Sequence, residues 1–214
     1  TFQLHAGLEV EGYSPEQSLA LLDDLFASEG LEQAFPPALL TLLKAYGGHY
    51  WGVPVNIHRS NVLWYNKAVF EENGLTPPTT FEEFMQVADA LQAAGIQPYV
   101  MGTKDGWEAG HIFEDVLAGS LTPEEYRGLW TGGFSWTDPK VTQALENFKM
   151  MLSYANEDHP ALTWDGAGEY LISGTGGMMI MGDWTDGWFT SKDFTGYGWA
   201  PPPGTQGIFV GLSD

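Results

Sequence analysis

The segment from Trp164 to Trp184 constrains the fold of this chain more than any other part of its sequence. It begins with an amphipathic stretch that predicts a short helix, and a glycine break around Gly174 predicts a turn. Residues 178–181 then predict a strand, and Gly182-Asp183-Trp184 stands where that strand gives way to a loop. A helix, a turn and a strand in this order favour a sheet in which ligands bind beyond the carboxyl ends of the strands.

The rest of the sequence repeats this alternation of helices and strands, which indicates an α/β fold. Helices are predicted at residues 15–26, 37–46, 66–73, 80–94 and 108–117, after Thr122 and Asp138, and from Trp164; strands are predicted at 49–55, 61–65, 96–101, 178–181 and at the apolar end of the chain. Three of these helices are predicted to begin with a capping box, at Ser14, Thr80 and Thr122, because each is followed by Glu or Gln three residues later. The helix after Asp138 is predicted to bury one stripe of side chains, Val141, Ala144, Leu145, Phe148 and Leu152.

Charge and composition exclude several classes of function. The formal net charge is −20, which disfavours nucleic acid and anionic membrane surfaces as partners. The chain has no cysteine, so disulfides and thiolate metal sites are excluded, and its five histidines show no metal-binding spacing. We therefore expect no metal, no cofactor and no catalytic nucleophile of the common types.

Aromatic residues are the strongest functional signal. The chain has nine tryptophans, of which Trp51, Trp64, Trp130 and Trp136 have apolar neighbours and are predicted to be core. Trp184 follows Asp183 at a strand end, and an indole face beside a carboxylate suits a sugar, whose C–H face stacks and whose hydroxyls need acceptors. Trp164 lies near a helix start, and Trp107 follows a polar loop, where it either lines a cleft or caps the next helix.

A carbohydrate-active enzyme is the alternative that the same residues leave open. Glycoside hydrolases use two carboxylates about 5–9.5 Å apart, and Asp183 with Asp186 could supply such a pair. Any acidic chain offers pairs of this kind by chance, and no acid/base motif is recognisable, so we expect a binding protein and not an enzyme.

Polar side chains within two apolar stretches are further candidates. Gln3 and His5 alternate with Phe2 and Leu4, so both lie on one face of a predicted strand. Residues 56–61 carry Asn56 and His58 among apolar neighbours. They either form a turn with local backbone bonds or belong to a crossover between two lobes, with their donors facing a cleft.

Four segments together resemble the extracellular solute-binding proteins, family 1, that deliver sugars to ABC transporters. They are residues 1–7 (TFQLHAG), 53–67 (VPVNIHRSNVLWYNK), 75–84 (LTPPTTFEEF) and 199–207 (WAPPPGTQG). The third is similar to the Pro-Pro-x-Thr-hydrophobic-Glu-Glu turn of that family, and the second and fourth to its lobe crossovers. Within the family, the chain looks closest to the glucose/mannose-binding type.

The resemblance implies a two-lobe, type II periplasmic-binding-protein-like fold that closes around a sugar. The expected parts are a partial N-terminal lobe at 1–57, a hinge crossover at 58–65, a C-terminal lobe at 66–195 and a return crossover and strand at 196–214. Membrane permease subunits are the expected partners of a monomer, and its expected location is periplasmic or extracellular, with or without a lipid anchor. Thr1 is not an initiator Met and no signal peptide follows it, so we expect an internal fragment, incomplete at both ends. The candidate sugar contacts are Gln3, His5, Asn56, His58, Trp107, Trp164, Asp183, Trp184 and Asp214.

Overall fold

The computed structural model describes residues 7–205 and 208–213 and divides the chain into two compact units. The smaller unit comprises Thr1–His58 and Leu212–Asp214, and the larger comprises Arg59–Gly211. The division therefore falls inside two short strands, β1 (Ile57–Arg59) and β6 (Gly211–Ser213), which pair as a two-stranded sheet. The lobe boundaries expected from the sequence stay a prediction.

The smaller unit is built of short helices. They are η1 (Gly7–Tyr13), α1 (Pro15–Ser18), α2 (Asp23–Ser28), α3 (Leu31–Ala34) and α4 (Pro37–Leu43). Its core forms around Phe26, Leu43 and Tyr50, with the Phe26 and Tyr50 rings stacked at a centroid distance of 3.7 Å.

The larger unit contains a four-stranded sheet and most of the helices. Its strands are β2 (Leu63–Asn66), β3 (Gln97–Tyr99), β4 (Gly176–Ile180) and β5 (Tyr197–Ala200). Its helices are α5 (Lys67–Glu72), α6 (Phe81–Ala93), α7 (Trp107–Ser120), α8 (Pro123–Thr131), α9 (Pro139–Leu152), η2 (His159–Ala161), α10 (Trp164–Ile172) and α11 (Trp184–Ser191).

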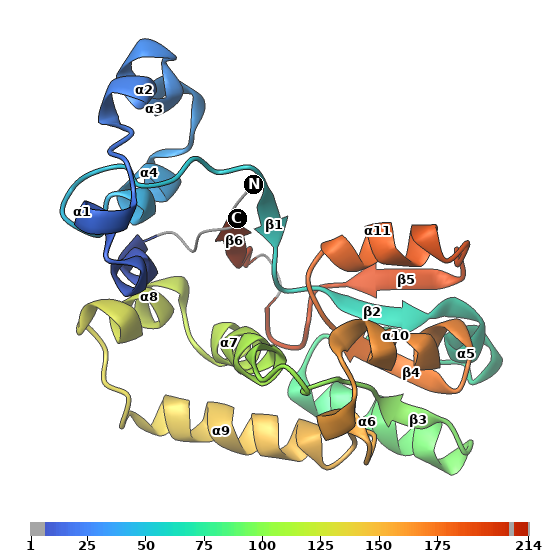
Figure 1. The fold of residues 1–214 in the computed structure, drawn as a ribbon. Helices are drawn as coiled ribbons and strands as arrows, with labels where there is room; N and C mark the ends of the chain where they lie inside the picture. The colour runs from blue at the N-terminus through green and yellow to red at the C-terminus, as the bar shows by residue number, and fades with distance from the viewer. Residues whose placement is uncertain (1–6, 206–207, 214) are drawn as a thin grey trace. The chain divides into compact units, whose positions relative to one another are not determined.

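The sheet has the order β3-β4-β2-β5, and Figure 1 shows the four strands side by side. β3 and β4 are parallel, with Tyr99 opposite Met178, whereas β2 runs antiparallel to both β4 and β5. The carboxyl ends of β3, β4 and β5 therefore meet the amino end of β2 at one edge of the sheet. Three candidate ligand residues follow strands that end at this edge, Trp107 after β3 and Asp183 and Trp184 after β4.

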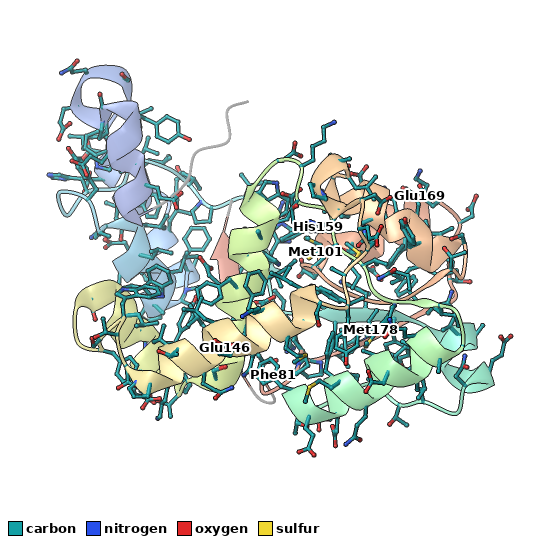
Figure 2. All side chains as sticks on the ribbon, turned by 90° about the horizontal axis from the view of Figure 1, so that it is seen from below. Phe81, Met101, Glu146, His159, Glu169 and Met178 are labelled. Carbon is teal, nitrogen blue, oxygen red and sulfur yellow. The ribbon has the colours of Figure 1, made fainter. Side chains whose placement is uncertain are left out.

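Alternation along the strands gives the sheet two buried faces. Leu63, Met178 and Ile180 point into a large cluster with residues of α6, α7 and α9, and α9 runs beside α7 in Figure 1. Trp64 and Met179 point the other way, into a second cluster with α10 and α11. Figure 2 shows Met178 inside the first of these two clusters, while the exposed Glu146 and Glu169 lie on the outer surfaces of α9 and α10. The expected α/β fold is thus confirmed.

Two of the three predicted capping boxes are present. The Thr80 hydroxyl accepts a hydrogen bond from Glu83 N at 3.1 Å, and the Glu83 carboxylate accepts from the N–H groups of Thr79 and Thr80. Thr122 and Glu125 make the same reciprocal pair at α8. Hydrogen bonds from Thr79 also hold the pKa of the Glu83 carboxyl below its ordinary value.

Thr80→Ala is expected to lower the free energy of unfolding by about 1 kcal/mol, because the Glu83 N–H loses its acceptor at the first turn of α6. Thr142→Ala is the matched control, since Thr142 is exposed inside α9, and it should change stability by less than about 0.5 kcal/mol. Urea unfolding of both variants measures the difference. Equal stabilities would show that the cap contributes nothing.

The sequence predictions for the smaller unit were largely wrong. Ser14 has a φ of 50° and makes no side-chain cap, and the predicted helix breaks into α1 and α2, with Phe26 buried and Leu25 exposed. Residues 49–55 form no strand. Pro54 lacks an N–H for a ladder, and Tyr50 instead accepts a backbone bond from Leu22 while its ring enters the core.

Other corrections concern side chains of the larger unit. Trp130 and Trp136 were expected in the core but are 54% and 46% exposed, packed edge-to-face on each other. Leu145 is also exposed, and Met151 is buried on the stripe of α9 in its place. Trp184 does not lie on a loop but begins α11. Across the described part of the chain, none of the helices combines the length and the apolar character needed to cross a membrane.

Candidate sugar-binding site

Three segments of the larger unit meet at the sheet edge described above. Residues 59–62 lead into β2, residues 100–106 follow β3, and residues 181–183 follow β4. Backbone bonds join the first and third segments, since Met181 N donates to Val62 O at 3.0 Å and Asp183 N donates to Arg59 O at 2.9 Å. The geometry of the site is therefore fixed by the sheet and not by a free loop.

The position of the Trp184 indole depends on Gly182. A Cβ at Gly182 would lie 2.1 Å from the Cζ3 atom of Trp184, so only a glycine lets the ring fold back over the chain here. Trp184 is half-buried and belongs to the apolar cluster beneath α10 and α11. One face of a large aromatic side chain is thus held at the end of β4.

Asp183 is the N-cap residue of α11, and its carboxylate faces the crossover segment. Its Oδ2 accepts a hydrogen bond from Arg59 N at 2.9 Å, in addition to the backbone bond from Asp183 N to Arg59 O. A carboxylate anchored in this way is an acceptor of fixed direction beside the indole. Sugar hydroxyls are donors that such an acceptor binds.

Trp107 comes to the same edge from the loop after β3. Gly106 has a φ of 86°, a conformation that suits glycine, and the chain turns there into α7 at Trp107. The Trp107 ring is 44% exposed, and its centroid is 6.2 Å from that of Trp184 at an interplanar angle of 55°. The structure therefore brings together two of the three tryptophans that the sequence singled out.

Trp164 lies at the start of α10, next to the loop after β3. Gly102 meets this helix start so closely that a Cβ there would be 2.1 Å from the Thr163 carbonyl oxygen. The Trp164 ring pairs with Trp188 of α11, edge-to-face at 5.6 Å. Trp164 is thus at the same sheet edge as Trp184 but in a different ring pair.

A buried group of ionisable side chains lies on α7 behind the exposed Trp107. Glu108, His111 and Asp115 are all buried, and both carboxylate oxygens of Glu108 and of Asp115 lack a hydrogen-bond partner among the described residues. Burial lowers the pKa of His111 to about 4. Burial also raises the pKa of Asp115 well above its ordinary value, and the Glu114 charge adds to the rise.

The approach of His111 to Asp115 is therefore not an ion pair at neutral pH. His111 Nε2 is 3.8 Å from Asp115 Oδ2, a distance that permits one, but burial disfavours the charged form of both groups. The Arg59 charge favours the ionised form of Asp115, but burial outweighs it. Burial therefore favours the neutral forms of both His111 and Asp115 behind the tryptophans.

The remaining predicted contacts stay predictions. Asn56 and His58 belong to the smaller unit, and Gln3, His5 and Asp214 lie outside the described residues. Sequence reasoning missed His111 and Gly182. His111 could have been found from its position four residues after Trp107 on a predicted helix, which places both on one face.

The chemistry of an enzyme finds little support here. Asp186 is exposed on α11 and its Oδ1 accepts a hydrogen bond from the Tyr197 hydroxyl, while Asp183 is bonded to Arg59 N. Each carboxylate of the proposed catalytic pair thus has a structural partner. In the described ranges, no group of three His, Asp or Glu side chains is arranged to hold a metal ion.

Comparison with known proteins identifies the family of the chain. Residues 6–211 match the family described as bacterial extracellular solute-binding protein. An uncharacterised ABC transporter extracellular-binding protein of Pyrococcus horikoshii, PH1214, is 34% identical over 94% of this chain and 44% of its own length. A probable sugar-binding periplasmic protein of Rhizobium meliloti is 31% identical over 97% of this chain and 51% of its own.

Among solved structures, the bacterial solute receptor AcbH, described as having an exclusive preference for β-D-galactopyranose, superposes with a TM-score of 0.78. It is 26% identical, and the match covers 94% of this chain and 51% of that one. The chain thus spans about half the length of the proteins it resembles.

The matched proteins are named as binding proteins and receptors, so the expectation of a binding protein and not an enzyme is confirmed for the family, as is its extracellular or periplasmic location. The solute-binding resemblance seen in the sequence is likewise confirmed, whereas the glucose/mannose type stays a prediction. This chain belongs to the family of bacterial extracellular solute-binding proteins.

Proposed function

We propose that the protein containing this chain binds a neutral mono- or small oligosaccharide and delivers it to the permease of an ABC transporter. The observation that carries the proposal is the pair of indoles from α7 and α11 at one sheet edge, with the Asp183 carboxylate beside them. Family membership and the sugar-binding names of its relatives support the same class of ligand.

The chemistry of the site favours an uncharged ligand. The aromatic faces of Trp107 and Trp184 suit the C–H faces of a pyranose, and the groups behind them are neutral or are hydrogen-bond acceptors. A polyamine would need several ionised carboxylates at the site, but burial favours the protonated form of Asp115. Within the sugars, a glucose- or mannose-like ring is our finer proposal, and galactose is included in its test because of AcbH.

The remaining predicted features complete the proposal. The lobes at 1–57 and 66–195 close on the sugar by a hinge motion about the crossovers 58–65 and 196–214, and the closed monomer docks on permease subunits. The proposed sugar contacts are those expected from the sequence, Gln3, His5, Asn56, His58, Trp107, Trp164, Asp183, Trp184 and Asp214.

Titration calorimetry on the protein expressed from its whole reading frame tests this function. D-glucose, D-mannose, D-galactose, D-xylose and maltose form the panel, with spermidine as the charged comparison, and at least one sugar should bind with a Kd in the micromolar range or tighter, about −8 kcal/mol. Binding of spermidine with no response to any sugar would overturn the proposal. Product analysis after incubation with maltose should show no cleavage, and cleavage would favour the hydrolase alternative.

A further inference from the structure

The ring of His111 forms a triangle with the two indoles of the candidate site. Its centroid lies 5.8 Å from Trp107 at 82° and 5.6 Å from Trp184 at 58°. His111 is 7% exposed and Trp107 is 44% exposed, so the imidazole is the inner member of the group. Trp107 and His111 are one turn apart on α7, whereas Trp184 comes from α11. The imidazole is therefore a contact through which α7 holds a side chain of another helix.

A second contact ties His111 to the crossover segment. Its Nδ1 atom is 3.3 Å from the Ser60 hydroxyl, and both side chains are buried. Ser60 is itself held by its backbone, since Ser60 N donates to Val210 O at 2.8 Å. His111 thus joins Ser60, the residue that follows β1, to the aromatic pair.

Trp184 is attached to the same crossover by a separate route. Its neighbour Asp183 exchanges two hydrogen bonds with Arg59, one through the backbone and one through the carboxylate. Arg59 and Ser60 are adjacent, so a displacement of this segment reaches Trp184 both through Asp183 and through the imidazole. The first route moves the backbone of Trp184, and the second moves the surface on which its ring rests.

We propose that His111 is a positioning residue that sets the orientation of Trp184 against Trp107 and passes any displacement of Ser60 to these two indoles. The contribution of His111 to ligand binding rests on the proposed function, because the orientation of the indoles affects affinity only if they stack on a sugar. The positioning itself is independent of any sugar and can be measured without one. No relay of protons is involved, since the ring acts by its shape and by one hydrogen bond.

Fluorine NMR of the whole protein labelled with 5-fluorotryptophan tests the proposal, with each resonance assigned by a Trp→Phe variant. Ser60→Ala should move the Trp184 resonance by more than its linewidth. In a His111→Phe background, where a ring remains but the bond to Ser60 is lost, Ser60→Ala should cause no further movement. A residue that only fills space would show no dependence on Ser60, so this coupling separates positioning from packing.

A second background protects the test from loss of folding. His111→Gln keeps a group that can bond Ser60 but has no ring, and the effect of Ser60→Ala on Trp184 should be lost there as well. His49→Phe is the matched control, because the His49 ring contacts Trp51 at 6.3 Å in the smaller unit and bonds Asp23. It should move the Trp51 resonance and leave those of Trp107 and Trp184 in place.

The outcomes separate this proposal from the function on which it rests. The positioning role would be overturned if Ser60→Ala left the Trp184 resonance unmoved, or if it moved that resonance as far in His111→Phe or His111→Gln as in the unchanged protein. Coupled resonances with no binding of any sugar of the panel would leave positioning intact and reject the proposed function. If both hold, His111→Phe should weaken binding of the best sugar of the panel roughly tenfold, which corresponds to ~1.4 kcal/mol.

Discussion

Asp115→Asn is expected to make the protein more stable than the unchanged sequence, by an amount that grows as the pH rises above about 4. Burial raises the pKa of Asp115, so the folded protein retains this proton over a pH range in which the unfolded chain has lost it. The folded state then binds more protons, and its stability falls with rising pH by up to about 1.4 kcal/mol per pH unit. Asparagine is neutral at every pH and has no such loss.

Urea unfolding at several values between about pH 4 and pH 8 measures the difference between the two proteins. The chain has 28 acidic residues. Subtracting the free energies of unfolding of the two proteins at each pH cancels the contributions of the 27 acidic residues that they share. Asp105→Asn is the control, because Asp105 is exposed in the loop before α7, and its difference should not grow with pH. A difference for Asp115→Asn that stays constant would contradict the prediction.

His111 adds a pH dependence of opposite sign, which the Asp115→Asn background should expose. Its pKa falls from 6.5 to about 4 in the folded protein, so between these values the unfolded chain binds more protons and stability rises with pH. The full change is about 3 kcal/mol, at 1.36 kcal/mol per unit of pKa. Adding His111→Gln to Asp115→Asn should remove this rise of stability with pH. If the rise persisted, it would have to come from a group other than His111.

The larger unit could be predicted well from its sequence because its local signals agree with its packing. Thr80 and Thr122 begin helices as their capping boxes predict, and β2 and β4 coincide with apolar runs buried on both faces. In the smaller unit the signals conflict. A box at Ser14 and an apolar run at residues 49–55 do not form the predicted cap and strand, and the Phe26 and Tyr50 rings stack in a small core instead.

The candidate site was predictable only where its chemistry stands next to a strand end. Trp184 and Asp183 were found because they follow β4 directly, and Trp107 because it follows a polar loop. The contact between Trp107 and Trp184 depends on β3 and β4 being neighbours in the sheet. Local sequence does not encode this strand order, since the two strands are about 80 residues apart along the chain. Local sequence does not distinguish Glu108 and Asp115 from exposed acids, and only tertiary packing buries them.

Trp184→Ala is expected to weaken sugar binding by the whole protein far more than it weakens folding. Loss of one stacking face removes apolar contact and C–H/π attraction of about 2 kcal/mol, which is roughly a thirtyfold rise in Kd. Trp184 is only half-buried, so its truncation should cost less stability than the truncation of a fully buried tryptophan. A purely structural tryptophan would instead lose about 3–5 kcal/mol of stability on truncation.

Gly182→Ala provides a second measurement in which Trp184 itself is retained. The added methyl group would overlap the indole at 2.1 Å, so the ring must turn away and sugar binding should weaken in the same direction as in Trp184→Ala. Gly187→Ala, within α11, is the matched control, because nothing lies within 4 Å of a Cβ there, and its Kd should equal that of the unchanged protein. Melting temperature and Kd for the best sugar of the panel are measured on the same samples. An unchanged Kd in well-folded Trp184→Ala and Gly182→Ala proteins would remove Trp184 from the site, whereas a shift in both relative to Gly187→Ala places the sugar against this indole face.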